Sequence, residues 1–292
     1  MSIDTAPIGQ RSAATAMVAA DDQADEQTLA RLAAAERKAR RRAHVLGIRV
    51  VSLVVVLSAW EYFGRRIDQV LFTTPSAIAA AAVVMIGSGE LWTYLAPSLV
   101  VLVVGLLIAA VLGIGSGLLL ARFWVLDVAL DMYVTFLYST PTVALVPVIV
   151  LWAGFEASAK IIILFLFAFF PLVINTYQGV KAVDPKLLEV GRAFRCSERQ
   201  LWFNIVLPAV LPFIVTGLRL AVGRGLIGMV LADLYTAISG IGYLIVRSAS
   251  TYRVDKMFVP IVTLGLLGIS LTALLRLMER RVAPWTAAAD QE

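Results

Sequence analysis

The 292-residue chain has little of the chemistry on which disulfides, metal centres and nucleotide hydrolysis depend. Its single cysteine, Cys196, excludes an internal disulfide and a cysteine metal cluster, and its single histidine, His44, has no ligand partners near it in the sequence. The phosphate-binding pattern G-x-x-x-x-G-K-[ST] is absent, so we do not expect this chain to hydrolyse ATP. Charged residues are scarce at 15%, against 60% hydrophobic residues. We therefore expect a protein that is not an enzyme and has no metal or cofactor of its own.

Long apolar segments recur along the whole chain, whose mean hydropathy is +0.86. A helix needs about 20 residues, at about 1.5 Å per residue, to cross about 30 Å of hydrocarbon. We predict six spans, at residues 45–63, 97–120, 126–155, 159–177, 213–235 and 258–278. The expected fold class is therefore all-α: a polytopic membrane protein with about six transmembrane helices. The net charge of +5 does not imply nucleic-acid binding, because the distribution of basic residues matters more than their sum.

Basic residues are unevenly divided between the two sides of these spans. One side holds a cluster at residues 37–42, then Arg122, Lys181, Lys186, Arg192, Arg195, Arg199, Arg276, Arg280 and Arg281. The other side holds fewer, namely Arg65, Arg66, Lys160, Arg247, Arg253 and Lys256. Because the basic side of a membrane protein is normally cytoplasmic, we expect both termini in the cytoplasm. The predicted parts are a largely flexible tail at 1–43, a transmembrane domain at 44–282 and a C-terminal tail at 283–292.

The longest polar interruption, residues 184–207, carries the start signals of two short helices, and we call it the elbow. Asp184 before Pro185 is typical of a helix start, since the carboxylate accepts from free backbone N–H groups and proline needs no donor there. Ser197 with Gln200 forms a capping box that opens a second helix. The sequence thus predicts a helix–turn–helix on the cytoplasmic face of the membrane.

The first elbow helix places Leu187, Val190 and Phe194 on one side, with charged residues around them. The spacing resembles the cytoplasmic EAA loop of permease subunits of bacterial ABC importers, whose pattern is E-A-A, three residues, G, nine residues, then I-x-L-P. Here Glu189-Val190-Gly191 stands for E-A-A, Arg195 falls where the glycine is expected, and Ile205-Val206-Leu207-Pro208 follows in register. Arg195 thus replaces a residue type that tolerates the left-handed conformation.

This resemblance implies a type I importer permease (MetI-like) fold in a bacterial inner membrane, with a coupling loop at 178–207. It also implies partners: two copies of a separate ATPase subunit that bind ATP and Mg²⁺, a second permease subunit, expected to be identical, and an extracytoplasmic solute-binding protein. The elbow helix would dock into a groove on the ATPase. The residues that the resemblance assigns to this contact are Leu187, Glu189, Val190, Gly191, Phe194, Arg195, Leu207 and Pro208.

Small residues at helical spacing interrupt two of the apolar segments. Gly113 and Gly117 lie in the second segment, and Gly217, Ala221 and Gly225 lie in the fifth. Neither set is a nucleotide-binding pattern, because each lies inside an apolar helix with no flanking strand. Small residues four apart instead let two membrane helices approach closely. We predict that both sets pack helices.

Five residues are candidates for the solute path. Thr140 and Pro141 lie where prolines break the third span, which predicts either a cavity-lining break or a simple packing kink. Arg219, Arg224 and Asp233 lie in or near the fifth span, where charge is costly, so they should face water, the protein interior or each other. Alternatively, Arg219 and Asp233 extend to opposite membrane interfaces as anchors.

The region from Gly217-Leu-Arg219 through Asp233 to Ser239-Gly240-Ile-Gly242 resembles the nitrate, sulfonate and taurine branch of these permeases, where glutamate usually stands at the Asp233 position. This favours a small organic or inorganic anion as the solute. The same machinery could instead import an aromatic acid or a vitamin precursor. A third hypothesis is a stand-alone secondary transporter or channel, which would need mid-membrane carboxylates or an internal repeat.

Overall fold

The computed structural model describes residues 40–41, 44–68 and 71–282. The chain divides into two compact units, Met1–Arg66 and Ile67–Glu292. In the first unit the described part is a single apolar helix, His44–Gly64, which agrees with the first predicted span. The predicted tails at 1–43 and 283–292 lie outside the described residues, apart from residues 40–41.

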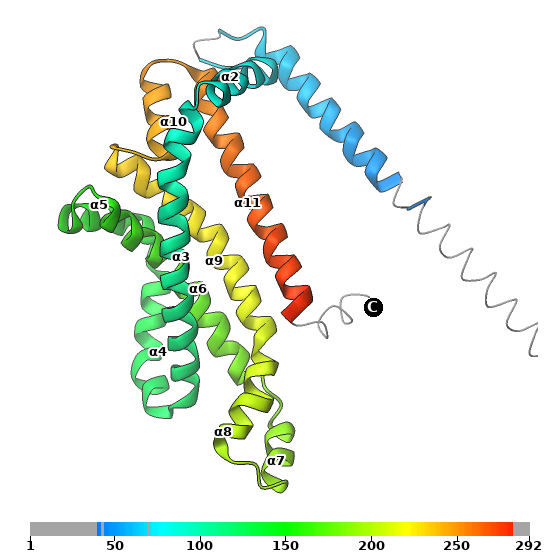
Figure 1. Cartoon of the computed structure of the whole chain (residues 1–292), viewed down its shortest axis with the longest axis vertical. Helices are drawn as coiled ribbons and strands as arrows, with labels where there is room; N and C mark the ends of the chain where they lie inside the picture. Colours follow the sequence, from blue (N-terminus) through cyan, green and yellow to red (C-terminus); the bar gives the residue numbers. More distant parts are fainter. Residues whose placement is uncertain (1–39, 42–43, 69–70, 283–292) are drawn as a thin grey trace, which may run out of the picture. The chain divides into compact units, whose positions relative to one another are not determined.

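The described part of the second unit contains helices and no strands (Figure 1). Its elements are α2 (Pro75–Gly87), α3 (Glu90–Arg122), α4 (Trp124–Ser139), α5 (Thr142–Ala153), α6 (Ala157–Lys181), α7 (Pro185–Ala193), α8 (Glu198–Leu201), the π-helix η1 (Trp202–Val206), α9 (Leu207–Thr236), α10 (Ile241–Ser250) and α11 (Val254–Val282). Two of these, α2 and α10, are short helices that the sequence analysis did not place. The long helices start up to seven residues before their predicted bounds.

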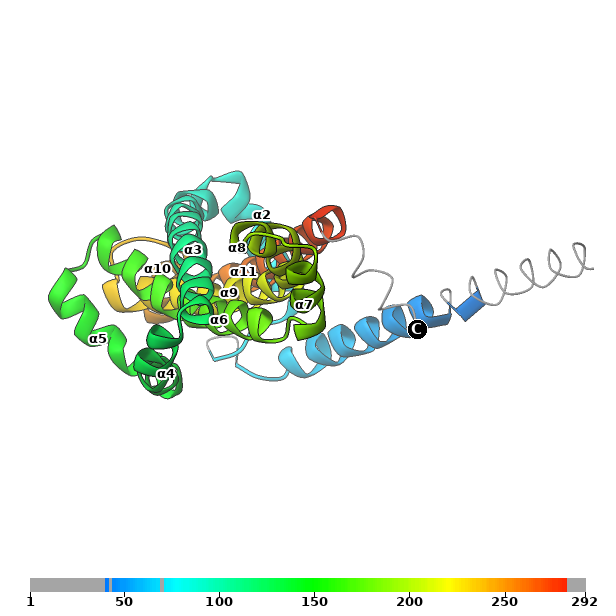
Figure 2. The same cartoon turned by 90° about the horizontal axis from the view of Figure 1, so that it is seen from below.

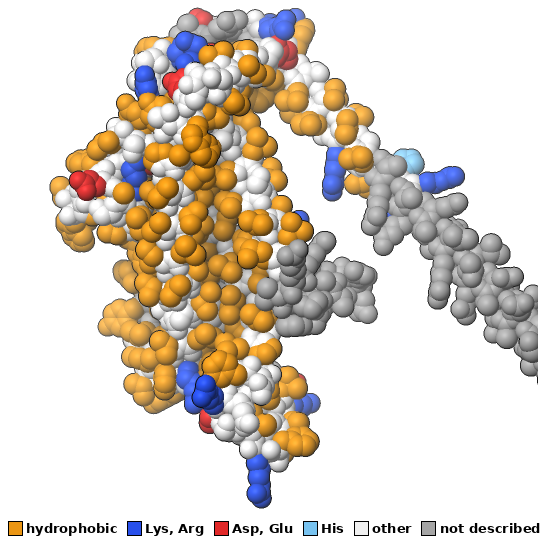
Figure 3. All heavy atoms as spheres, in the orientation of Figure 1, with side chains coloured by type: hydrophobic (Ala, Val, Ile, Leu, Met, Phe, Trp, Pro, Cys, Tyr) orange, Lys and Arg blue, Asp and Glu red, His pale blue; other side chains and the backbone are white. Residues whose placement is uncertain are grey.

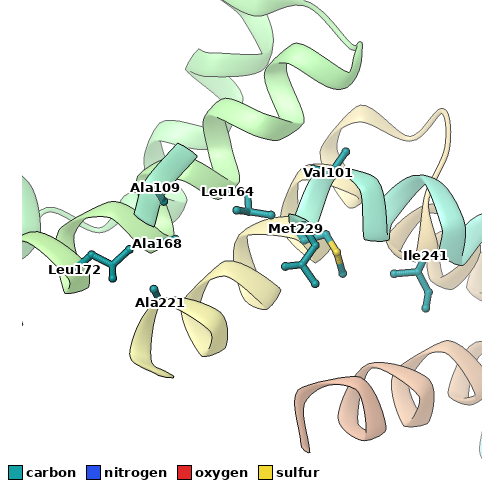
Figure 4. Close-up of a cluster of buried hydrophobic side chains, with 9 residues drawn as sticks. Val101, Ala109, Leu164, Ala168, Leu172, Ala221, Met229 and Ile241 are labelled. Atoms are coloured by element: carbon teal, nitrogen blue, oxygen red, sulfur yellow. The ribbon is translucent and has the colours of Figure 1, made fainter. Parts of the chain in front are cut away.

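The centre of the second unit is formed by α3, α6 and α9, which run side by side in both views (Figures 1 and 2). Their facing sides supply most of a cluster of buried side chains, drawn in Figure 4, to which α10 adds Ile241. Ala109 comes from α3, Leu164 and Ala168 come from α6, and Ala221 and Met229 come from α9. Small side chains alternate with large ones here, which lets the three helices approach closely enough to fill the core.

The third predicted span, 126–155, is broken at Pro141, as the sequence predicts. It is divided between α4 and α5, which meet at 92° across the break at Thr140 and Pro141. Proline has no backbone N–H and disfavours helical geometry in the residue before it, so Pro141 ends α4 at Ser139. Pro147 does not end a helix, since α5 continues through it to Ala153. In both views α5 points away from the core.

The surface of the second unit is mostly apolar along its length. Figure 3 shows hydrophobic side chains over most of the visible face of the bundle, with basic side chains concentrated towards its two ends. Within the described residues of the whole chain, five helices are long and apolar enough to cross a bilayer, or six if the bent α4–α5 pair counts as one span. This agrees with the expected polytopic membrane fold of about six spans.

Candidate functional site

Both elbow helices begin at the N-cap residues that the sequence predicts. At the start of α7 the Asp184 carboxylate accepts a hydrogen bond from the backbone N–H of Lys186 (2.9 Å). At the start of α8 the backbone N–H of Gln200 donates to Ser197 Oγ (3.3 Å), and the backbone N–H of Ser197 donates to Gln200 Oε1 (2.8 Å). Two free backbone donors are thus satisfied reciprocally, which fixes where the second helix begins.

The turn between the two elbow helices keeps a left-handed residue although the expected glycine is replaced. Arg195 has φ 54°. Its backbone N–H donates to Arg192 O (2.8 Å), and the next N–H, from Cys196, donates to Gly191 O (3.0 Å). These two bonds form the motif that commonly closes helices at a glycine. An arginine in this conformation costs about 1–2 kcal/mol relative to a right-handed one, so the turn stores local strain.

The inner side of the elbow is packed tightly against the start of the following helix. Gly191 is the buried residue of α7, and a Cβ atom there would overlap the side chains of Leu201 and Ile205. Leu188 joins a buried cluster that includes Val206 and Val210. Gly191 therefore lets α7 lie close to the helix that leads into the membrane bundle.

The outer side of α7 is apolar and exposed. Leu187, Val190 and Phe194 are 50%, 54% and 80% exposed, respectively. We call these three residues the outer elbow face. Charged side chains, including Lys186 and Glu189, surround it on the same exposed surface. Two of these large apolar side chains lie on the nine-residue helix α7 and the third is at its C-cap, and together they form a surface suited to binding another protein.

Leu207 and Pro208 lie behind this face and are only partly exposed. They begin α9 directly after η1, and α8, η1 and α9 form one continuous helix, Glu198–Thr236. Because Pro208 has no backbone N–H, Asn204 O lacks its usual donor, and the Leu207 N–H reaches one residue further back, to Trp202 O. Of the residues assigned to the ATPase contact, the structure thus places these two in the helix that supports the elbow.

Side chains from four helices connect the elements at the elbow end of the bundle. Asp127 on α4 accepts from Lys181 Nζ (2.8 Å) and from the Tyr177 hydroxyl (2.6 Å), both on α6. Arg122, at the end of α3, forms an exposed ion pair with Glu198 of α8 (3.4 Å). The elbow is therefore connected to the bundle by polar contacts as well as by packing.

The small residues lie where helices approach most closely. A Cβ atom at Gly113 would lie 2.8 Å from Leu172 Cβ, and one at Gly117 would lie 2.7 Å from Thr176 Cβ, both on α6. On α9, a Cβ atom at Gly217 would lie 3.1 Å from Asn175 Cβ of α6. One at Gly225 would lie 3.0 Å from Leu106 Cδ2 of α3, and Ala221 is fully buried. Helix packing accounts for the size of these side chains.

Asp233 is fully buried at the end of the bundle opposite the elbow, where it forms an ion pair with Lys160. Lys160 Nζ, in the first turn of α6, donates to Asp233 Oδ1 (2.8 Å), and the two side chains are 4% and 1% exposed. Lys160 Nζ also donates to Ser239 O (2.6 Å) and Ser239 Oγ (3.1 Å). This overturns the alternative of Asp233 as an interfacial anchor.

The second carboxylate oxygen of Asp233 connects to α3 and α10. Ser98 Oγ of α3 donates to Asp233 Oδ2 (2.6 Å), and so does the backbone N–H of Gly242 (3.3 Å). A Cβ atom at Gly240, which has φ 102°, would overlap the Asp233 carboxylate. The Ser239-Gly240-Ile-Gly242 stretch is therefore shaped by the buried carboxylate that it encloses.

The two arginines of α9 have different environments. Arg219 forms an ion pair with Glu279 of α11 (2.6 Å), which gives it a partner inside the chain. Arg224 is exposed and lies against Tyr138, whose hydroxyl accepts from Arg224 Nη2 (3.2 Å). Tyr138 adjoins the break at Thr140 and Pro141, so the structure brings Arg224 near two other candidate path residues. Arg219 and Asp233 are each engaged in ion pairs.

The described part of the chain thus combines a three-helix membrane core with an exposed amphipathic elbow at one end. Residues 109–284 match the family model described as "Binding-protein-dependent transport system inner membrane component". The match covers more than half of the chain, and the chain belongs to this family. It is accordingly a membrane-spanning permease subunit of an ABC importer.

Two relatives support this assignment, and one solved structure shares the fold. The SsuC protein of Bacillus subtilis strain 168, named for aliphatic sulfonate transport, is 33% identical over 79% of this chain and 84% of its own length. The formylaminopyrimidine transport permease ThiX of Halalkalibacterium halodurans is 32% identical over 80% of this chain and 93% of its own length. A chain of the MetNI methionine ABC transporter shares the fold, with a TM-score of 0.52 and 19% identity over 65% of this chain and 94% of that one.

The sequence analysis missed the partners of its own candidate residues. Lys160, Ser98 and Ser239 surround Asp233, and Glu279 pairs with Arg219. Lys160 stands alone among apolar residues at the start of a span, which is a signal that could have indicated a buried partner. Nothing in the order of residues identifies Asp233, 73 positions away, as that partner.

Proposed function

We propose that the outer elbow face binds the ATPase subunit of the importer and that the continuous helix Glu198–Thr236 carries the motion of the ATPase into the bundle. The observation that supports this most directly is the exposure of Leu187, Val190 and Phe194 on a helix that the rest of the elbow holds in a defined position. Burying these side chains in a groove would supply the apolar contact that the helix lacks within the described residues. ATP and its Mg²⁺ would then bind to the partner ATPase.

The elbow end of the bundle is proposed to face the cytoplasm, together with both termini. Arg122, Lys181 and Lys186 lie at this end, as do Arg192, Arg195 and Arg199 of the elbow. The opposite end exposes fewer basic side chains, in part because Lys160 is buried. The positive-inside rule supports this orientation. The solute-binding protein would then dock on the opposite, extracytoplasmic end.

The importer is proposed to contain two permease subunits and two ATPase subunits. The described part of each chain contains a single elbow, so a machine driven by a pair of ATPases needs a second elbow from another permease. An identical copy is the simplest source of the second elbow, because symmetric pairs are the commonest oligomers. Closure of the ATPases would draw the two elbows together and switch the path between its two openings, which is alternating access driven by a ligand that favours one state.

The proposed solute is a small organic or inorganic anion of the sulfonate, taurine or nitrate type. The relative named for aliphatic sulfonate transport supports this class. The second candidate is a vitamin precursor, supported by the relative named for formylaminopyrimidine transport at nearly the same identity. An exposed Arg224 in the middle of α9 favours the anion, because a cation in a solute path attracts negative charge.

The elbow proposal is tested by purifying the permease from native membranes and identifying the subunits that accompany it. Val190→Glu places a charge in the centre of the outer elbow face and should remove the ATPase subunit, whereas the wild type should retain it at equal stoichiometry. The matched control is Ile238→Glu, which changes a similarly exposed aliphatic residue (62%) in the turn after α9 at the opposite end. Retention of the ATPase by the Val190→Glu variant would reject the outer elbow face as its binding surface.

The orientation and the cargo need separate measurements. A labelling reagent that does not cross membranes should reach an engineered cysteine at Lys186 only in inverted vesicles, which places the elbow in the cytoplasm. Labelling in right-side-out cells would reverse the proposed orientation.

The solute is tested by growth on taurine or ethanesulfonate as the sulfur source. Growth that is lost when this permease is deleted and restored when it is supplied would support the anion. Restoration of formylaminopyrimidine uptake instead would support the second candidate.

A further inference from the structure

Arg224 occupies a position that is difficult to explain by packing alone. It lies about 26 Å from the first residue of α9 and about 18 Å from the last, at about 1.5 Å per residue. Its side chain is exposed, and the ion pairs among the described residues do not include it. A charged arginine is costly in hydrocarbon, and here the helix ends lie farther away than an arginine side chain extends. The surface around Arg224 is therefore not a lipid-facing surface.

The exposed side of α9 forms a continuous stripe around Arg224. At helical spacing it comprises Phe213, Thr216, Leu220, Gly223, Arg224 and Ile227. Gly223 leaves the space beside Arg224 open, since a Cβ atom there would meet nothing within 4 Å. An uncharged stripe would fit a lipid-facing helix, but one with a central arginine beside an open position fits a path that admits water and solute.

Tyr138 holds the guanidinium of Arg224 in place from the neighbouring span. Its ring centroid lies 5.0 Å from Arg224 Cζ, and its hydroxyl accepts one hydrogen bond from Nη2 (3.2 Å). Within the described residues this leaves most of the five guanidinium donors for another acceptor. Tyr138 stands one residue before the end of α4, directly at the 92° break. Arg224 is thus oriented by the end of α4, where the α4–α5 span is broken.

The same tyrosine borders a cavity of about 280 Å³ between α3, α4 and α6. Thr135 and Gln178 contribute polar side chains to its lining, and Asp127 there is neutralised by Lys181. The volume is close to the lower end of the range for small-molecule sites. Tyr138 therefore contacts both Arg224 and a space of ligand size.

We propose that Arg224, positioned by Tyr138, is the residue of the translocation path that recognises the anionic group of the solute. This inference rests on the proposed import of an anion. A sulfonate or nitrate oxygen would accept hydrogen bonds from the free guanidinium donors. The guanidinium would also neutralise the negative charge of the solute near the middle of the membrane, where an isolated charge costs most. Arg224 contacts the solute directly, and Tyr138 is a positioning residue that acts through Arg224.

The test reconstitutes the complete importer, with its ATPase and binding protein, in liposomes and measures ATP-dependent uptake of labelled taurine and ethanesulfonate. Arg224→Gln should lower uptake about tenfold or more, the effect of losing one hydrogen bond to a charged group. Arg224→Lys keeps the charge and should lose less. Tyr138→Phe keeps the ring but not the hydroxyl and should fall between the wild type and Arg224→Gln. All three variants should assemble with the normal subunit ratio.

The matched control is Arg276→Gln, which removes one exposed arginine from α11 and should leave uptake unchanged. Normal anion uptake by Arg224→Gln would overturn the assignment of Arg224 while leaving the importer function intact. Dissociation of the two permease subunits in Arg224→Gln would also overturn it, because the arginine would then pair with a carboxylate of the second copy. If the wild-type complex imports formylaminopyrimidine but neither taurine nor ethanesulfonate, both the proposed anionic solute and the proposed role of Arg224 are rejected.

Discussion

The buried ion pair between Lys160 and Asp233 gives the sharpest prediction of stability. Lys160→Met keeps the length of the side chain and removes its charge, which leaves the Asp233 carboxylate buried without a cation. Because the two side chains are only 4% and 1% exposed, solvent cannot compensate for the loss. Breaking one partner of such a pair costs about 3–5 kcal/mol. The carboxylate keeps its bonds from Ser98 and Gly242, so we expect the lower part of this range.

The change is measured as the apparent melting temperature of the purified full chain in detergent, followed by tryptophan fluorescence. At about 2–4 °C per kcal/mol, Lys160→Met should melt at least about 6 °C below the wild type. The matched control is Arg122→Met, which breaks the exposed pair with Glu198 (42% and 57% exposed) and should cost less than about 1 kcal/mol. Scan rates are kept equal, because unfolding in detergent is governed by a rate.

A double variant separates the effect of charge from the effect of packing. Lys160→Met with Asp233→Asn leaves no buried charge, and the asparagine oxygen still accepts from Ser98. If the cost of the single variant is the isolated carboxylate, the double variant should recover at least half of the lost melting temperature. Additive losses, or a Lys160→Met variant that melts with the wild type, would refute the reasoning.

Three further predictions concern the elbow and the core. Arg195→Gly should relieve the left-handed strain and stabilise the elbow by about 1 kcal/mol, seen as slower hydrogen exchange of the Cys196 amide; faster exchange would contradict it. Gly117→Ala should destabilise the chain by about 1–3 kcal/mol by overpacking α3 against α6, whereas Gly115→Ala, with nothing within 4 Å, should not; equal melting temperatures would reject the close approach. Val190→Glu should release the ATPase with no change in melting temperature, because its side chain is exposed.

The elbow was predictable because its signals are local. The caps at Asp184 and Ser197 depend on bonds that reach two or three residues, and the sequence contains both partners of each. The left-handed turn at Arg195 was not predictable from residue type, since arginine rarely adopts it. The structure keeps the turn because its two backbone hydrogen bonds, to Gly191 and Arg192, close α7.

The bundle was predictable in number of spans but not in shape. Pro141 predicts a break in the third span, but neither hydropathy nor a proline gives the angle of 92° at which α4 and α5 meet. The pairing of Lys160 with Asp233 joins positions 73 residues apart, and only tertiary packing defines it. The sequence set Arg219 and Asp233 apart from Arg224 as possible interfacial anchors, but only the structure shows that each of the two has an internal partner.

The unbroken helix Glu198–Thr236 makes the elbow and the buried ion pair the two ends of one lever. Its 39 residues span about 58 Å, so a tilt of about 5° at the elbow moves the far end by about 5 Å. The stiffness of this lever is lowest at η1, where Pro208 removes a backbone hydrogen bond next to the elbow. The far end is held by Lys160 and Ser98, which belong to other helices. A small tilt of the elbow would therefore bend the helix near η1 and leave its far end in place. A larger tilt would have to move α9 together with α3 and α6, which hold its far end.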